Sequence, residues 1–222
     1  MEINILMLGG KRCGKTTVLS LIAGLIRPTL GRVLVCGGDA AESKARLGYM
    51  LQRDELFPWR TIERNVLLPL EIKRPKSRKN NEYALNLLKK YGLEEFKKSY
   101  PDELSGGMRQ RVALIRTLSF KPSVLLLDEP FSSLDYQTRL NVTADVCSII
   151  RKENKTAILV THDISEAVSV ADRIIVLSKR PATLKRNHRL GFAPTLSPLE
   201  RREQPEFRRW FEILWKELND EN

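Results

Sequence analysis

The stretch MLGGKRCGKTTVL, residues 7–19, decides how the rest of this 222-residue chain is interpreted. It overlaps the apolar run INILML at 3–8, which is typical of a strand buried on both faces. It leads into KTTVLSLIAGLI at 15–26, which has helical spacing. Residues 9–16 match the pattern G-x-x-x-x-G-K-[ST]. A chance glycine loop is the alternative, but the strand before the pattern and the helix after it favour a phosphate-binding loop.

This loop predicts a site for the phosphates of a nucleotide. Its glycines let the backbone N–H groups turn inward, and the helix N-terminus adds the positive end of a dipole. We predict that Lys15 reaches the β- and γ-phosphates and that Thr16 offers its hydroxyl to Mg²⁺. The predicted nucleotide-binding residues of this segment are Gly9, Gly10, Lys11, Arg12, Cys13, Gly14, Lys15, Thr16 and Thr17.

A second apolar strand, SVLLLDEP at 123–130, ends in two adjacent carboxylates. We predict that Asp128 holds Mg²⁺ and that Glu129 polarises the attacking water as catalytic base. An apolar run followed by Asp-Glu is a weak signal alone. At this distance after a phosphate-binding loop it becomes a strong one.

The order of the remaining elements indicates an α/β fold with a mostly parallel sheet. Further strands are expected at 32–38, 46–52, 156–163 and 173–178, and helices at 61–72, 82–92 and 105–120. Pro69 should stop or kink the first of these helices. The predicted architecture is a P-loop NTPase, RecA-like core at 1–72 and 122–190, an inserted helical subdomain at 73–121 and an amphipathic helical tail at 191–222.

The tail carries an apolar stripe at helical spacing. Its members are Phe207, Trp210, Phe211, Leu214 and Leu218. Packing on the body of the protein is the favoured interpretation, and a surface for a partner is the alternative.

The net charge of +11 and the pI of about 9.7 favour a partner rich in phosphate or an anionic membrane face. Residues 73–121 hold 13 Lys and Arg against 5 Asp and Glu, so this segment is either a docking surface or a solvated helical face. The three cysteines have neither disulfide nor zinc spacing. No apolar run approaches the roughly 20 residues of a membrane span, which predicts a cytoplasmic protein.

The run LSGGMRQR at 104–111 resembles the signature of the ATP-binding cassette (ABC) ATPases. Ser105 suits a helix N-cap, and the two glycines after it expose N–H groups as a second anion site. A cap alone would explain Ser105 but not both glycines. The resemblance implies a head-to-tail dimer in which the signature residues close on the γ-phosphate of ATP held by the other subunit. Those residues are Leu104, Ser105, Gly106, Gly107 and Met108.

Three further positions match family motifs. Gln52 resembles the glutamine that touches Mg²⁺ and reports on the membrane partner. Asp135, in SSLD at 132–135, resembles the key residue of the loop that crosses the dimer interface. His162, in VTHD, resembles the histidine that contacts the γ-phosphate. A structural histidine is the alternative, since Asp163 and Glu166 by themselves form a capping box.

The segments at 51–66, 173–185 and 205–218 resemble the nitrate/sulfonate/taurine-type import ATPases. That resemblance implies a cytoplasmic subunit lying on the inner face of the membrane. It also implies an integral permease, an extracytoplasmic solute-binding protein and no nucleic acid. A groove beside Gln52, with Phe57 and Trp59, would receive a helix of the permease, although both aromatics could instead belong to the core.

Two features depart from this family pattern. Arg12 stands where such importers usually have glycine, and it could help phosphate binding or obstruct the loop. Only eight residues precede Gly9, so we expect the family's first antiparallel strands and its adenine-stacking aromatic to be missing. A misassigned start, a shortened chain and a natural lack of this part are all open. Losing one base-stacking contact would weaken ATP binding by about 10- to 100-fold and leave a sheet edge exposed.

The sequence therefore predicts an ATPase subunit that powers a membrane importer, with Glu129 and His162 as catalytic residues. The alternative is a soluble ABC ATPase acting on nucleic acid or ribosomes, with which the charge is compatible. A binding-defective relic is a third interpretation, opposed by the intact carboxylate pair, signature and histidine. The transported substrate cannot be read from the chain.

Overall fold

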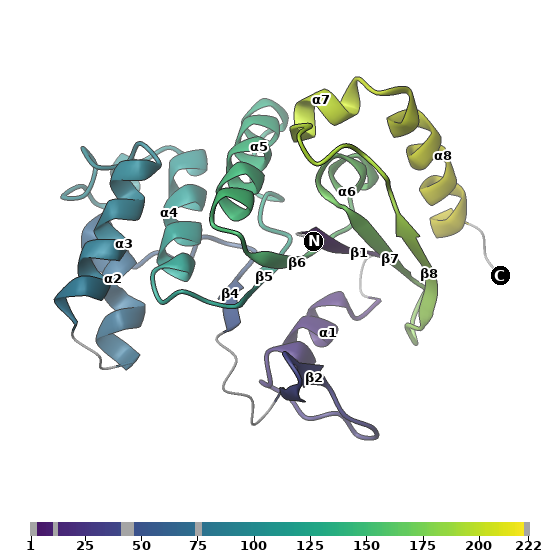
Figure 1. Ribbon diagram of the computed structural model, residues 1–222, viewed down its shortest axis with the longest axis horizontal. Helices are drawn as coiled ribbons and strands as arrows, with labels where there is room; N and C mark the ends of the chain where they lie inside the picture. The colour runs from purple at the N-terminus through teal and green to yellow at the C-terminus, as the bar shows by residue number, and fades with distance from the viewer. Residues whose placement is uncertain (1–3, 11–12, 41–46, 74–76, 220–222) are drawn as a thin grey trace.

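A largely parallel sheet with helices on both faces forms the centre of the molecule (Figure 1). The computed structural model describes residues 4–10, 13–40, 47–73 and 77–219. The six strands of the sheet follow the order β4-β5-β6-β1-β7-β8. Only β8 is antiparallel to its neighbour. The predicted α/β class with a mostly parallel sheet is confirmed.

The strands of this sheet are β1 (Asn4–Leu8), β4 (Leu47–Met50), β5 (Val124–Asp128), β6 (Thr156–Thr161), β7 (Arg173–Leu177) and β8 (Leu184–Arg189). The helices are α1 (Lys15–Ile22), α2 (Ile62–Lys73), α3 (Arg78–Lys90), α4 (Gly106–Leu118), α5 (Tyr136–Lys152), α6 (Ile164–Val170), α7 (Pro198–Arg202) and α8 (Pro205–Asn219), with a 3-10 turn at Pro101–Glu103.

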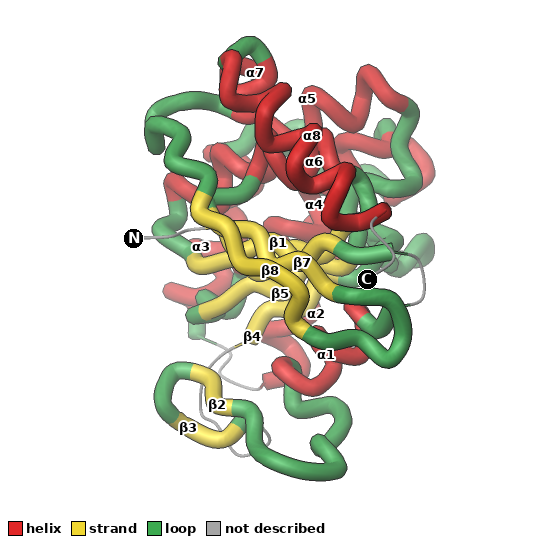
Figure 2. Tube along the Cα trace, turned by 90° about the vertical axis from the view of Figure 1, so that its right-hand side faces the viewer, coloured by secondary structure: helices red, strands yellow, loops and turns green. Residues whose placement is uncertain are grey.

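Strand β5 shows why an unbroken apolar run is needed at the centre. Its successive side chains point to opposite faces, and both faces are covered. Leu126 packs with Leu19 of α1 on one face. Leu125 and Leu127 join the larger core on the other face, where α5 and α6 lie (Figures 1 and 2). All four leucines are fully buried, so each contributes about 1.5–3 kcal/mol.

Helices α2, α3 and α4 pack together at one end of the molecule (Figure 1). Of the two outcomes expected at Pro69, a stop or a kink, the stop is wrong, because α2 continues through Pro69 to Lys73. A proline removes one helical hydrogen bond. Val66 and Leu70 on either side of it are buried in the core, and that packing outweighs the loss.

The single strand expected at 32–38 is instead a two-stranded hairpin. Strand β2 (Leu34–Val35) pairs antiparallel with β3 (Gly38–Asp39). Cys36 and Gly37 both have positive φ, 51° and 84°, which makes the tight turn that joins two such strands. Leu30 and Leu34 are 89% and 55% exposed, so this part of the molecule presents an open apolar surface.

The C-terminal tail packs on the body, as the stripe predicted. Leu214 is fully buried, and the other four stripe residues are partly buried against the core. Trp210 Nε1 donates to the carbonyl of Leu190, 3.1 Å away. Strand β8, beneath α8, was not predicted, because its sequence LKRNHR is polar. It lies at the edge of the sheet, where charged side chains are usual.

Glu153, just after α5, joins that helix to α3. Its carboxylate accepts from Lys90 Nζ and Tyr91 Oη, both at 2.7 Å, and from Tyr83 Oη at 3.2 Å. Burial alone would raise the pKa of Glu153, but the hydrogen bonds from Lys90 and Tyr91 outweigh it and hold the pKa below its ordinary value. Burial and the Glu153 charge raise the pKa of both tyrosines to about 12.

Replacing this carboxylate should loosen α3 from α5. We expect Glu153→Gln to lower the free energy of unfolding by about 1–3 kcal/mol, since bonds to a charged group are lost. Glu94→Gln is the matched control: Glu94 is half-exposed and lies 3.9 Å from Lys89, a surface pair worth about 0–1 kcal/mol. Urea denaturation measures both, and equal effects would show that the Glu153 cluster is no stronger than a surface pair.

Candidate nucleotide site

The predicted catalytic residues and most of the described nucleotide-binding residues meet where four neighbouring parallel strands end. The chain leaves β1 into the phosphate-binding loop, β4 toward Gln52, β5 at Asp128 and β6 toward His162. Open parallel sheets bind ligands at this edge. A cavity of about 680 Å³ opens there, and its lining residues are Gly14, Lys15, Thr16, Thr17, Gln52, Arg53, Glu129, Ser132, Ser133 and His162.

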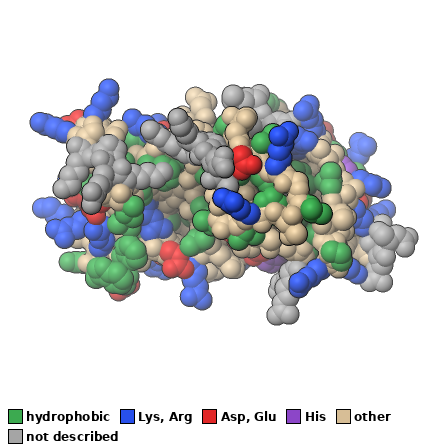
Figure 3. All heavy atoms as spheres, turned by 90° about the horizontal axis from the view of Figure 1, so that it is seen from below, with side chains coloured by type: hydrophobic (Ala, Val, Ile, Leu, Met, Phe, Trp, Pro, Cys, Tyr) green, Lys and Arg blue, Asp and Glu red, His purple; other side chains and the backbone are tan. Residues whose placement is uncertain are grey.

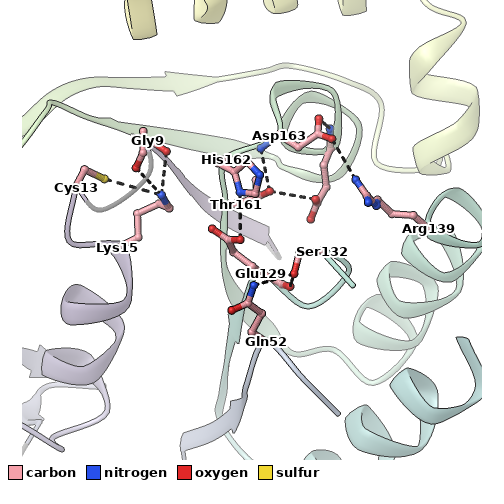
Figure 4. Close-up of polar contacts among 12 residues, drawn as sticks. Gly9, Cys13, Lys15, Gln52, Glu129, Ser132, Arg139, Thr161, His162 and Asp163 are labelled. Carbon is pink, nitrogen blue, oxygen red and sulfur yellow. Dashed lines mark hydrogen bonds and ion pairs between the residues drawn. The ribbon is translucent and has the colours of Figure 1, made fainter. Parts of the chain in front are cut away.

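The glycine loop holds the lysine of the motif by its main chain. Lys15 Nζ donates to the carbonyls of Gly9 and Gly10, at 2.9 and 2.8 Å, and lies 4.0 Å from Cys13 Sγ (Figure 4). Gly14 caps α1 with φ of 112°, a conformation that favours glycine. A Cβ at Gly9 would come within 2.8 Å of Cys13 Sγ, so this glycine is needed for close packing. Lys11 and Arg12 lie outside the described residues.

Asp128 and Thr16, both predicted as Mg²⁺ ligands, lie in direct contact. The Asp128 carboxylate is buried, is hydrogen-bonded to the Thr16 side chain and accepts from Tyr49 Oη at 3.4 Å. Burial raises the pKa of Asp128, and the negative charge of Glu129 adds to that shift. Within the described ranges, no group of three His, Cys, Asp or Glu side chains could hold a metal. The pair instead suits Mg²⁺ held by few protein ligands together with waters and phosphate oxygens.

Glu129 and His162 both line the cavity and contact each other. His162 Nδ1 lies 3.1 Å from Glu129 Oε2 (Figure 4). Glu129 has a φ of 44°, and its N–H donates to the carbonyl of Val160. A left-handed residue other than glycine at a strand end is a strained position of the kind found at functional sites. The turn brings Glu129 into the cavity directly after buried Asp128.

Gln52 does not hydrogen-bond to Asp128. It contacts the loop that follows Glu129. Its Nε2 donates to Ser132 Oγ at 3.1 Å, and Ser132 Oγ donates to the carbonyl of Glu129 at 3.0 Å. Ser132 and Ser133 both line the cavity, although we did not predict them as site residues. Their place in SSLD was the only sequence signal for them.

The residues around His162 depart from the expected capping box. Asp163 does cap α6, because its Oδ1 accepts from the N–H of Glu166 at 3.1 Å. The Glu166 side chain does not return to the Asp163 N–H, which instead donates to Thr161 Oγ1. Glu166 is buried and its Oε2 accepts from the Thr161 hydroxyl at 3.0 Å. The capping box is therefore half formed, and the Glu166 side chain lies beneath the turn at residues 161–163.

The signature segment begins α4 away from this cavity. Ser105 Oγ accepts from the Met108 N–H at 3.3 Å, as expected of an N-cap. A Cβ on Gly107 would come within 2.6 Å of Val142 of α5, so close helix packing also requires this glycine. Gly106 lines a separate cavity of about 390 Å³, and Leu104 is buried. In the described part of the chain, the cavity at Gly106 has no lining residue from the phosphate-binding loop.

Asp135 caps α5 rather than lining either cavity. Its Oδ1 accepts from the Thr138 N–H at 3.0 Å, and hydrogen bonds from Thr138 lower the pKa of Asp135. The loop 132–135 thus ends in a fixed helix start. We call residues 132–135 the interface loop and residues 161–163 the histidine turn.

Fold and site together define a nucleotide-binding cassette, and comparison with known proteins agrees. The family described as ABC transporter matches residues 3–132. An uncharacterized ABC transporter ATP-binding protein of Bacillus subtilis, YtlC, is 48% identical over 219 residues, which are 97% of this chain and 83% of the relative. The taurine import ATP-binding protein TauB of Rhizobium johnstonii is 39% identical over 188 residues, 85% of this chain and 72% of the relative.

Among solved structures, the ATP-binding cassette MJ0796, described as a dimer in a post-hydrolysis state bound to ADP and Pi, superposes with a TM-score of 0.68. It is 31% identical and the match covers 86% of this chain and 87% of that one. The chain therefore belongs to the ABC transporter family, as an ATP-binding and ATP-hydrolysing subunit. It is similar to the ATPases of taurine, nitrate and sulfonate import.

Buried Glu166 should make stability depend on pH. Burial raises the pKa of Glu166 to about 8. The folded state thus favours its neutral form, so its contribution is complete below the unfolded pKa near 4.5 and is lost as pH rises toward 8. We expect up to about 1.4 kcal/mol lost per pH unit across that window. Glu166→Gln should flatten this slope in urea unfolding at pH 5 to 8. Parallel curves for the two proteins would contradict a neutral Glu166.

Proposed function

We propose that this chain is the ATPase subunit of an importer for solutes of the nitrate, sulfonate and taurine type. The single observation that carries the chemistry is the Glu129–His162 pair, 3.1 Å apart in the cavity that also holds Lys15. The solute class rests on the relatives named above, because an import ATPase of this kind does not itself touch the solute.

Each group in the cavity is suited to one part of hydrolysis. Bound ATP supplies the phosphoryl group to be transferred, and bound Mg²⁺ would neutralise its charge. Lys15 and the loop N–H groups bind phosphate oxygens, while Thr16, Asp128 and Gln52 are the proposed Mg²⁺ ligands. Glu129 accepts a hydrogen bond from the attacking water, and His162 orients Glu129 and reaches toward the γ-phosphate.

A second copy of this chain is the proposed partner at the signature. Gly106, which follows the Ser105 cap, lines a cavity without residues of the phosphate-binding loop, so the N–H groups at this helix start suit ATP held by another subunit. Asp135 and the interface loop would lie at the contact between the two copies. Cassettes of this family dimerise, as MJ0796 does.

The proposed permease contact is an exposed aromatic pair. Phe57 and Trp59 stack with ring centres 5.0 Å apart and are 36% and 72% exposed, so they are not core residues. Buried Asn65 holds their loop through bonds to both the N–H and the carbonyl of Phe57. Arg116 donates to the carbonyls of Asp54 and Glu55, which ties the same loop to α4. A fixed, exposed aromatic surface suits a partner helix.

Charge supports a position beside the membrane. Lys and Arg side chains are spread over the face in Figure 3 and include a group at its left end, the end that α2, α3 and α4 form in Figure 1. Such a surface is attracted to anionic headgroups. No helix among the described residues is long and apolar enough to cross a membrane. We therefore propose a cytoplasmic subunit held peripherally on the inner face by an integral permease, with an extracytoplasmic solute-binding protein acting indirectly.

We retain the division into a core at 1–72 and 122–190, a helical subdomain at 73–121 and a tail at 191–222 as part of this proposal. Glu153 and α3 make one joint between the core and the subdomain. The loop tied by Arg116 makes another. Movement of the subdomain would therefore shift the loop that carries the proposed permease surface.

Glu129→Gln should abolish ATP turnover while ATP binding is retained, because the amide cannot accept the water proton. Steady-state phosphate release measures turnover, and calorimetric titration with Mg²⁺–ATP measures binding. Lys15→Ala is the companion variant and should lose binding as well. Full turnover by Glu129→Gln would rule out its proposed role.

Trp59→Ala should weaken the association with the permease without changing ATP binding. The tagged chain, purified from membranes of its own host, is expected to bring down an integral membrane protein, and Trp59→Ala to bring down at least about tenfold less. Trp215→Ala, which removes another exposed tryptophan on α8, is the matched control. Recovery of nuclease-sensitive RNA in place of a membrane protein would favour an ABC ATPase acting on nucleic acid.

A further inference from the structure

Arg139, on the first turn of α5, contacts two loops that come from different strands. Its Nη2 donates to the carbonyl of Leu134 in the interface loop at 2.8 Å. Its Nη1 lies 3.8 Å from Asp163 Oδ2 in the histidine turn (Figure 4). The planar guanidinium has donors directed along several edges, so one side chain can contact both loops at once.

The contacts of Asp163 restrict the main chain beside its neighbour His162. One carboxylate oxygen caps α6, and the other faces Arg139. The Asp163 N–H is fixed by Thr161 Oγ1 at 3.1 Å. The main chain on both sides of His162 is thereby held while the imidazole points to Glu129.

Glu166 lies beneath the same turn and could compete with Asp163 for the guanidinium. It is buried, and burial raises its pKa to about 8, which favours the neutral form. The charges that face it are Asp163 in the turn, Arg139 of α5 and Glu129 after β5. Among the described residues, Arg139 Nε and Glu166 Oε1 are buried without a hydrogen-bond partner. Asp163 is therefore the carboxylate that pairs with Arg139, with its Oδ2 3.8 Å from Nη1.

We propose that Arg139 is a positioning residue, which ties the interface loop to the histidine turn and so holds His162 against Glu129. This inference rests on the proposed roles of Glu129 and His162. The Arg139–Asp163 pair is about one-third exposed on both sides and long at 3.8 Å. Such a pair adds little to stability, so a large effect of its removal on turnover would mark positioning rather than folding.

The test measures kcat, KM, ATP affinity and melting temperature for Arg139→Ala, Asp163→Asn and the double variant. Asparagine caps a helix as well as aspartate does, so Asp163→Asn removes the charge and keeps the cap. We expect each single variant to lower kcat by about 10- to 100-fold, as a small misplacement of a reacting group does. KM and ATP affinity should stay within about twofold. The double variant should be no slower than the slower single one.

Arg151→Ala is the matched control. Arg151 lies on the same helix and also contacts a carboxylate, Asp172 at 3.1 Å, and a carbonyl, that of Pro194. Neither of those residues lines the nucleotide cavity. The control should keep normal kcat, with a melting temperature at or below that of Arg139→Ala. Arg139→Lys should recover only part of the rate, because one ammonium cannot replace the several directed donors of the planar guanidinium.

Three results would overturn the inference. They are an unchanged kcat in either single variant, losses that multiply in the double variant, and an equal loss in Arg151→Ala. The proposed function is judged separately by Glu129→Gln. If Glu129→Gln is inactive and Arg139→Ala is normal, the positioning role of Arg139 fails and the ATPase assignment stands. If Glu129→Gln is active, the proposed catalytic roles fail whatever Arg139 does.

Discussion

The side-by-side parallel pairing of β4, β5, β6 and β1 is the constraint on which the site depends. Parallel strands in one sheet end at the same edge, so the segments that follow them are brought together however far apart they lie in sequence. Leu8 pairs with Thr161, and Asp128 with Val160. This register places the glycine loop, the carboxylate pair and the histidine turn next to one another. A different strand order would separate the same motifs.

Buried carboxylates serve two different purposes in this molecule. Glu153 is held ionised by three donors and joins α3 to α5. Among the described residues, the side chain of Glu166 has the Thr161 hydroxyl as its one hydrogen-bond donor, so burial dominates and the neutral form is favoured. The difference follows from the number of donors, because each bond to the charged form offsets part of the cost of removing it from water. Near the site, the carboxylate that pairs with Arg139 is that of Asp163.

Several residues that suggest nucleotide chemistry also satisfy packing requirements. Gly107 allows α4 to approach α5, and Gly9 allows the chain to pass Cys13. Asp135 caps α5, and Asp163 caps α6. The loops around the nucleotide cavity are therefore parts of helix starts and helix contacts. Because rigid elements hold functional groups more accurately than free loops do, this arrangement favours a preorganised site.

The sequence by itself determined the fold class, the phosphate-binding loop and the family, because strand–loop–helix order and the spacing of glycine, lysine and carboxylate are local properties of the chain. It also determined that the C-terminal stripe packs inward. Other features were decided only by the tertiary structure. Helix α2 passes through Pro69 because of burial on both sides, and Glu166 turns beneath Thr161 instead of closing a capping box. Arg139 contacts Leu134, in the segment after β5, and Asp163, in the segment after β6. No local sequence pattern encodes which of the segments that connect strands become neighbours. That choice belongs to the strand order of the sheet, which long-range pairing and core packing set.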